Sequence, residues 1–134
     1  MSTAYYAAFH CLCGAIADEF AGGSGQVWNR FYRAVDHGHA RERCQRLVGV
    51  QGAHSGLVSF ANDFIQLQQL RHEADYNPEF RASKQAAAQA VARASAAIAS
   101  LQNADREQRR VFLVDFLVRQ LAGVAPFAPR AKSA

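Results

Sequence analysis

The sequence contains few prolines and few cysteines, and it has no long apolar run. Proline and cysteine each occur three times in 134 residues. No apolar stretch reaches the roughly 20 residues of a membrane-spanning helix. No basic segment followed by an apolar core opens the chain, so we expect neither a signal peptide nor a membrane anchor. The odd number of cysteines (Cys11, Cys13 and Cys44) fits reduced thiols, and we expect a cytoplasmic protein.

Lysine is also scarce, yet the chain is basic. Arginine supplies nearly all of the 15 positive side chains, and the formal net charge is +4. Such a balance is compatible with binding of a nucleotide or nucleic acid, although many basic domains bind neither. Five arginines lie close together in the sequence and form either a solvated face or a basic rim that contacts phosphates: Arg30, Arg33, Arg41, Arg43 and Arg46.

Metal and cofactor motifs are absent as well. The run His10-Cys11-Leu12-Cys13 is no metal motif, because residues two apart on a helix point away from each other. The glycine-punctuated segment 49–56 lacks the Gly-Lys-Ser/Thr of a phosphate-cradling loop. We therefore expect no bound metal and no cofactor.

The periodicity present is helical throughout, and no strand alternation competes with it. We expect a helix over 26–36, interrupted at 37–39 and resumed over 40–48, and an alanine-rich helix over 83–101. Ser55 is a candidate N-cap for the helix before Pro78, and the final helix, capped by Asp105, is expected to end at Gly123. The predicted fold is all-α: an antiparallel four-helix bundle with an additional short or broken helix, over residues 1–123, followed by a flexible tail at 124–134.

The segment that ends at Asn77-Pro78 carries charge on an apolar stripe. Leu57, Phe60, Phe64 and Leu67 recur at steps of three and four, and Arg71 and Asp75 continue the same face. These two side chains are four residues apart and can reach each other. Because a charge on a buried stripe is costly unless paired, the pair is either a structural clamp or a functional group at a cleft or subunit interface.

Two motifs resemble those of the HEPN family of small helical domains. Arg71-His72-Glu73-Ala74-Asp75-Tyr76 is similar to an Arg-x-x-Ala-Asp-Tyr signature, and Ala4 to His10 resembles the first-helix signature of the same subgroup. The resemblance implies a helical bundle that pairs as a homodimer. It also implies that the matching first helix begins a few turns earlier, so we expect that the chain starts late or that part of this helix is missing.

Catalytic HEPN domains are metal-independent ribonucleases with a histidine four to six residues after the matching arginine. Here those positions hold Asp75, Tyr76 and Asn77, and His72 directly follows Arg71. The formal match from Arg33 to His37 lies on another helix, and we interpret it as chance. The ring nitrogen expected for acid–base catalysis is therefore missing from the motif.

The sequence leaves three hypotheses about function open. The first is a non-catalytic, dimeric binding or accessory module for a nucleotide or RNA, acting with a nucleotidyltransferase or with a toxin–antitoxin or defence partner. The second is a divergent ribonuclease that uses Arg71 with His10 or His72, and the third is a purely structural interaction protein. We favour the first, for which the candidate ligand-binding residues are Arg71, Asp75, Tyr76, Tyr6, His10 and Arg33.

Overall fold

The computed structural model describes residues 2–50, 52–80 and 83–118. This part of the chain forms six α-helices and no strand, which confirms the predicted all-α class. The helices are α1 (Ser2–Phe20), α2 (Gln26–Tyr32), α3 (His37–Val48), α4 (Ser55–Tyr76), α5 (Lys84–Asn103) and α6 (Arg106–Val114). The tail predicted at 124–134 lies outside the described residues.

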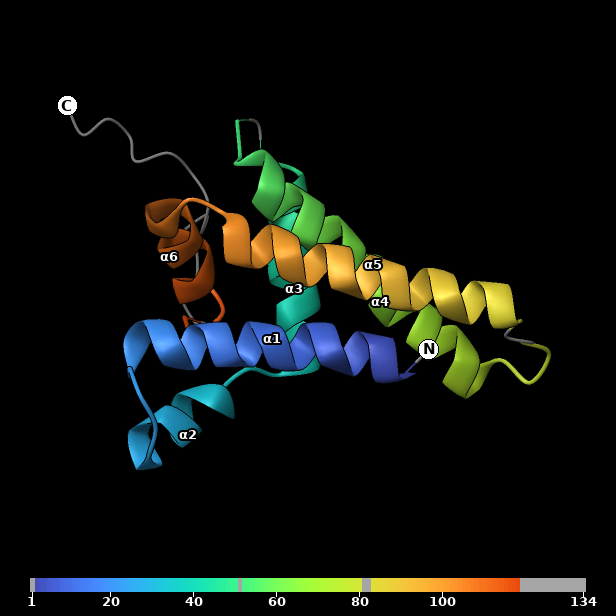
Figure 1. Cartoon of the computed structure of the whole chain (residues 1–134), viewed down its shortest axis with the longest axis horizontal. Coiled ribbons are helices and arrows are strands. Elements are labelled where there is room, and N and C mark those ends of the chain that lie inside the picture. Colours follow the sequence, from blue (N-terminus) through green and yellow to red (C-terminus); the bar gives the residue numbers. More distant parts are fainter. Residues whose placement is uncertain (1, 51, 81–82, 119–134) are drawn as a thin grey trace.

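Three long helices form the body of the molecule (Figure 1). Helix α4 runs opposite to α5, and Arg93 of α5 meets Asp63 of α4 at 3.0 Å. Helix α1 runs alongside α5 in the same direction and opposite to α4 (Figure 1). Helix α3 packs across α4, α2 lies on the outer side of α1, and α6 covers the end where α1 and α5 finish.

The core lies where α1 meets α4. The large side chains Tyr5, Leu12 and Ile16 of α1 are fully buried, as are Phe60 and Phe64 of α4. Burying an apolar side chain of this size contributes about 1.5–3 kcal/mol. Helix α5 packs against both helices through small residues, because Ala90, Ala94 and Ala97 allow close approach of the backbones.

The second predicted helix breaks earlier than expected. Helix α2 ends at Tyr32, and α3 already begins at His37, where we had predicted the interruption. The reason is Asp36, whose carboxylate accepts hydrogen bonds from the backbone N–H groups of Gly38 and His39. An aspartate in this position is a favourable N-cap and starts a helix despite the following glycine.

Two other helix ends also differ from the prediction. The N-cap of α4 is His54, whose Nδ1 accepts from the N–H of Gly56, rather than Ser55. Helix α6 is capped by Asp105 as predicted, but it ends at Val114 and is followed by a turn over 115–117. Gly123, where we expected the helix to end, lies outside the described residues. No helix among the described residues is both long and apolar enough to cross a bilayer.

Candidate functional site

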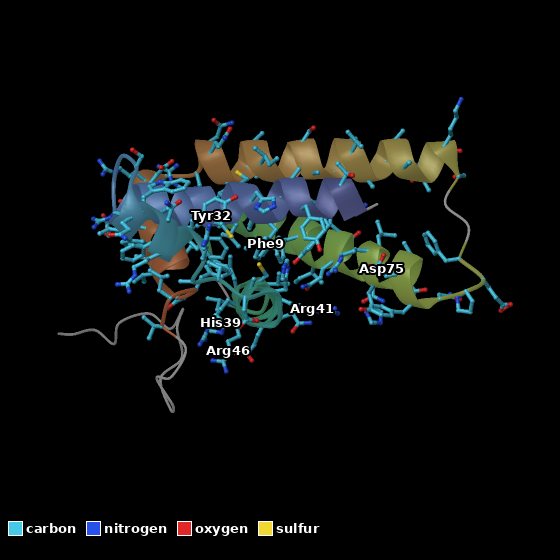
Figure 2. The ribbon with its side chains drawn as sticks, turned by 90° about the horizontal axis from the view of Figure 1, so that it is seen from below. Phe9, Tyr32, His39, Arg41, Arg46 and Asp75 are labelled. Carbon is cyan, nitrogen blue, oxygen red and sulfur yellow. The ribbon has the colours of Figure 1, made fainter. Side chains whose placement is uncertain are left out.

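Arg71 and Asp75 form the predicted pair on the last turns of α4. Arg71 Nε lies 3.3 Å from Asp75 Oδ2, and the two side chains are 27% and 37% exposed. The prediction of an interaction is confirmed, whereas the prediction of a fully buried stripe at this point is wrong. The stripe leaves the core after Leu67 because the last turns of α4 extend beyond the start of α1. Figure 2 shows Asp75 at this outer end of the helix.

The guanidinium of Arg71 lies over two tyrosine rings of α1. Its central carbon is 5.6 Å from the ring centroid of Tyr5 and 5.2 Å from that of Tyr6. A cation within about 6 Å of an aromatic centroid is attracted to the face of the ring. The two rings and Asp75 therefore fix the guanidinium, while its two terminal nitrogens make no hydrogen bond within the described part of the chain.

His37, the first residue of α3, joins this site through Tyr5. The Tyr5 hydroxyl lies 2.5 Å from His37 Nδ1, and it accepts a hydrogen bond of 3.2 Å from Gln68 Nε2. Gln68 Nε2 also donates to the backbone carbonyl of His37 at 3.1 Å. The ring of His37 stacks on Phe9, with centroids 4.0 Å apart. Residues from α1, α3 and α4 thus converge at one point on the surface.

The protonation of His37 follows from these contacts. Burial lowers the pKa of His37 below its ordinary value, and the positive charges of Arg71 and His10 lower it further. Burial also raises the pKa of Tyr5 well above its usual range, so the phenol keeps its proton. We assign the Tyr5 hydroxyl as the donor to His37 Nδ1, which leaves the single proton of the neutral imidazole on Nε2.

No motif on α4 or in the first helix points to His37. It lies 34 positions before Arg71, and the only pattern that contains it is the Arg33-to-His37 match, interpreted as chance. The structure does not bring Arg33 and His37 together as a pair. Arg33 caps the end of α2, and its exposed side chain makes no ion pair among the described residues. His37 is therefore linked to Arg71 of α4, through Tyr5, rather than to Arg33.

The other predicted site residues divide into two groups. Tyr6 lies under Arg71, and His10 lies one helical turn further along α1, with the two ring centroids 6.0 Å apart. His10 Nδ1 is 2.7 Å from the hydroxyl of Tyr32. The ring of His72 instead packs against that of Tyr76, with centroids 4.8 Å apart and a tilt of 44°, on the exposed end of α4. Tyr6 and His10 therefore belong to the site, whereas His72 and Tyr76 make no contact with its rings within the described part of the chain.

Two buried polar atoms beneath the site lack hydrogen-bond partners in the described chain. These are Arg71 Nε, whose contact with Asp75 has ion-pair distance without hydrogen-bond geometry, and Gln68 Oε1. Native proteins leave few buried polar groups unsatisfied, and such groups call for an explanation such as a functional role. Both atoms lie on the turn of α4 that faces Tyr5.

The basic cluster of the sequence is dispersed in the structure. Arg43 is buried and donates to the carbonyl of Val118, and Arg46 pairs with Glu42 at 3.9 Å. Arg41, labelled with Arg46 in Figure 2, donates to Gln69. Within residues 2–50, 52–80 and 83–118, no three side chains of metal-ligating type come together.

Comparisons of the chain with protein-family models, curated sequences and solved structures return no match. The fold and site define an all-helical bundle with a cluster of one arginine, two tyrosines and two histidines, in which Tyr5 is buried and the other four side chains are partly or fully exposed. The resemblance to HEPN domains rests on the two sequence motifs, and those motifs are adjacent in the structure: Tyr6 of the first lies beneath Arg71 of the second.

Proposed function

We propose that this protein is a non-catalytic, HEPN-like binding module for a phosphate-bearing ligand, a nucleotide or RNA. The observation that carries the proposal is the Arg71 guanidinium, which is held over two rings with both terminal nitrogens unengaged by the described residues. A guanidinium offers paired N–H donors that match phosphate oxygens. The N–H that we assign to His37 Nε2 adds a donor beside it.

The proposed module acts as a homodimer, with a nucleotidyltransferase or a toxin–antitoxin or defence partner. The resemblance to HEPN domains motivates both parts of this assembly. Exposed apolar side chains also remain on the described surface, among them Val91 of α5 and Val111 of α6. A nucleotidyltransferase encoded beside this protein would favour an accessory role over that of a purely structural helical protein.

The direct test is binding of a fluorescent adenine nucleotide, followed by anisotropy. Arg71→Ala is expected to weaken binding at least tenfold, because a charged hydrogen bond contributes about 1.5–3 kcal/mol. Arg46→Ala is the matched control, since Arg46 also pairs with a carboxylate on its own helix but lies away from the site. Equal affinity of the Arg71 variant and the unaltered protein would overturn the proposal.

One observation favours a second candidate, a ribonuclease. The motif on α4 lacks a histidine, and His37 of α3 lies at the site in its place. The positive charge of Arg71 lowers the pKa of His37. However, His37 Nδ1 is occupied by Tyr5, and a neutral imidazole with its proton on Nε2 cannot accept another proton there. We therefore expect purified protein to leave mixed RNA intact. Cleavage that disappears in Arg71→Ala and in His37→Ala or His10→Ala would promote the ribonuclease instead.

A further inference from the structure

A row of four aromatic rings leads away from Arg71 across α1 and α2. Tyr6 lies beneath the guanidinium of Arg71, and its ring is followed by that of His10, at 6.0 Å and an interplanar angle of 26°. Tyr32 comes next, 5.9 Å from His10 at 11°, and Trp28 ends the row, 5.0 Å from Tyr32 at 27°. We call the rings of Tyr6, His10, Tyr32 and Trp28 the aromatic row.

The middle of the aromatic row is nearly flat. His10 and Tyr32 are joined through a hydrogen bond of 2.7 Å between the Tyr32 hydroxyl and His10 Nδ1. A hydrogen bond to an imidazole nitrogen lies close to the ring plane. The two ring planes differ by only 11° at a centroid distance of 5.9 Å, and the hydrogen bond fixes this nearly parallel arrangement. Trp28 is fixed as well, since its Nε1 donates to Asp18 at 2.8 Å.

These rings are not part of the core. No residue of α2 is buried, His10 is exposed, and Tyr6 is only partly covered. By contrast, Tyr5 and Phe9, their neighbours on α1, are buried. Aromatic rings that served only to attach α2 to α1 would gain most from full burial. The row instead combines fixed orientation with exposed ring surface.

Positive charge accompanies the aromatic row. Arg71 lies at its first ring, and Arg30 and Arg33 are exposed on α2, where neither forms an ion pair within the described chain. The acidic side chain in contact with the row is Asp18, whose carboxylate is engaged by Trp28. Alternating ring faces and cations are what a single nucleic-acid strand requires, because its bases stack on aromatic faces and its phosphates seek cations.

We infer that the aromatic row is a binding surface for single-stranded nucleic acid, with bases stacking on Tyr32, His10 and Trp28. The phosphates contact Arg71 at one end and Arg33, which follows Tyr32 at the end of α2, at the other. This inference rests on the proposed function, because Arg71 is common to both. It extends the site from one phosphate to several successive nucleotides. A duplex is excluded from this mode of binding, since its base faces are already stacked.

The chain carries its own reporter for this test, because Trp28 is its single tryptophan. Twelve-nucleotide single strands of oligouridylate, oligoadenylate and oligothymidylate are titrated into the full chain, beside a 12-base-pair RNA duplex. We expect the single strands to bind and to quench Trp28 emission at saturation, and the duplex to bind more weakly. The comparison of RNA with DNA strands shows whether the 2′-hydroxyl matters. Quenching reports stacking at the row rather than affinity alone.

Tyr32→Leu is the central variant, and Phe31→Leu is its matched control. Both remove an aromatic ring from α2, but Phe31 stacks on Phe20 and lies outside the row. Loss of a base–aromatic stack typically costs 1–3 kcal/mol, so Tyr32→Leu should weaken strand binding roughly 5- to 150-fold. Phe31→Leu should leave it unchanged, and Tyr32→Phe, which keeps the ring, should restore most of the affinity. Circular dichroism establishes that each variant is folded.

A second measurement does not disturb any ring. The variant Arg33→Ala should reduce the slope of log affinity against log salt by about one, because each phosphate contact contributes about one to that slope. Arg30→Ala is the control and should leave the slope unchanged, because Arg30 is two positions from both Trp28 and Tyr32 and points away from them. Three results together would overturn the aromatic row as a binding surface. They are an unchanged slope, strand binding by Tyr32→Leu as tight as that of the unaltered protein, and no quenching of Trp28.

The two proposals fail in different ways. If a mononucleotide binds through Arg71 but single strands bind no better and do not depend on Tyr32, the aromatic row is refuted and the proposed function stands. If neither mononucleotide nor strand binds, the proposed function falls and the inference falls with it. Equal affinity for the duplex and for the single strands would refute base stacking on the aromatic row, and it would leave the proposed function standing.

Discussion

The hydroxyl of Tyr5 lies 2.5 Å from Nδ1 of His37, and this contact places a histidine of α3 beside the arginine of α4. Tyr5 is fully buried and touches His37, Gln68 and Arg71, which come from two different helices. Tyr5 belongs to the first sequence motif. It is therefore the residue of that motif that brings the side chains of the site together. Five predictions follow from its contacts and from the rest of the fold.

Tyr5→Phe should destabilise the protein by about 1–2 kcal/mol. The substitution keeps the ring but removes a hydroxyl that accepts from Gln68 and contacts His37, and a buried group that loses its partner costs about that amount. Urea denaturation measures the change. Tyr6→Phe is the control, because the Tyr6 hydroxyl makes no hydrogen bond within the described residues. Equal losses in the two variants would contradict the role given to the Tyr5 hydroxyl.

Asp75→Asn should change stability little and ligand binding more. The Arg71–Asp75 pair is partly exposed, so its loss should cost less than about 1 kcal/mol, rather than the 3–5 kcal/mol typical of a buried pair. Removing the carboxylate also removes a competitor for the guanidinium, and phosphate binding should tighten severalfold. Thermal melting and nucleotide anisotropy measure the two effects. A large fall in melting temperature together with weaker binding would show that Asp75 supports the site instead.

Binding of a phosphodiester should strengthen as pH falls from 7.5 to 5.5. His37 has a lowered pKa in the free protein, through burial and the charges of Arg71 and His10, and a bound phosphate would favour its protonated form. Binding then takes up a proton, so affinity rises as the proton concentration rises. A dinucleoside monophosphate is the appropriate ligand, because its diester does not titrate in this range. His37→Gln should lose most of this dependence, and an unchanged profile would contradict the prediction.

Asp115→Asn should stabilise the protein above pH 6. Burial raises the pKa of Asp115 to about 6, although the charge of Arg43 opposes the shift. Its Oδ2 is buried without a hydrogen-bond partner in the described chain. The folded state holds this proton more tightly than the unfolded state, so stability falls as pH rises from about 4 to 6 and stays lower above that.

The measurement for Asp115 is the free energy of unfolding at several pH values. The difference between the variant and the unaltered protein should be largest above pH 6, at about 2 kcal/mol, and should shrink toward pH 4. His39 and His37 titrate with the opposite sign, because burial lowers the pKa of each and folding then resists protonation. Both proteins contain His37 and His39, so the contributions of these histidines cancel in the difference in unfolding free energy. A constant difference at all pH values would contradict the assignment to Asp115.

Light scattering at micromolar concentration should give twice the chain mass of 14.7 kDa. The large apolar residues of α1 are buried within the protomer, but Val111 and Val114 of α6 are exposed. Val111 also lines an apolar groove of about 280 Å³ with Leu47, Val50 and Leu57. Val111→Asp should shift the protein toward monomer, whereas Val27→Asp on α2 should not. A monomer at this concentration in the unaltered protein would contradict the dimer.

The sequence by itself determined the helical class, most of the helix positions and the Arg71–Asp75 pair. Those features depend on local periodicity: steps of three and four define a helix face, and residues four apart on a helix are neighbours. The same local rules placed Tyr6 and His10 one turn apart on α1. Where a single side chain decided a boundary, as Asp36 does at the start of α3, the prediction failed by a few residues.

Only the tertiary structure decided which of these local features meet. The approach of His37 to Arg71 depends on α3 crossing α4 while α1 inserts Tyr5 between them, and no spacing along the chain encodes that crossing. The aromatic row depends likewise on α2 folding back along α1, so that Tyr32 meets His10 across 22 positions. How far the charged end of α4 is buried was decided by the length of α1 that covers it, because burial is a property of packed neighbours rather than of one helix.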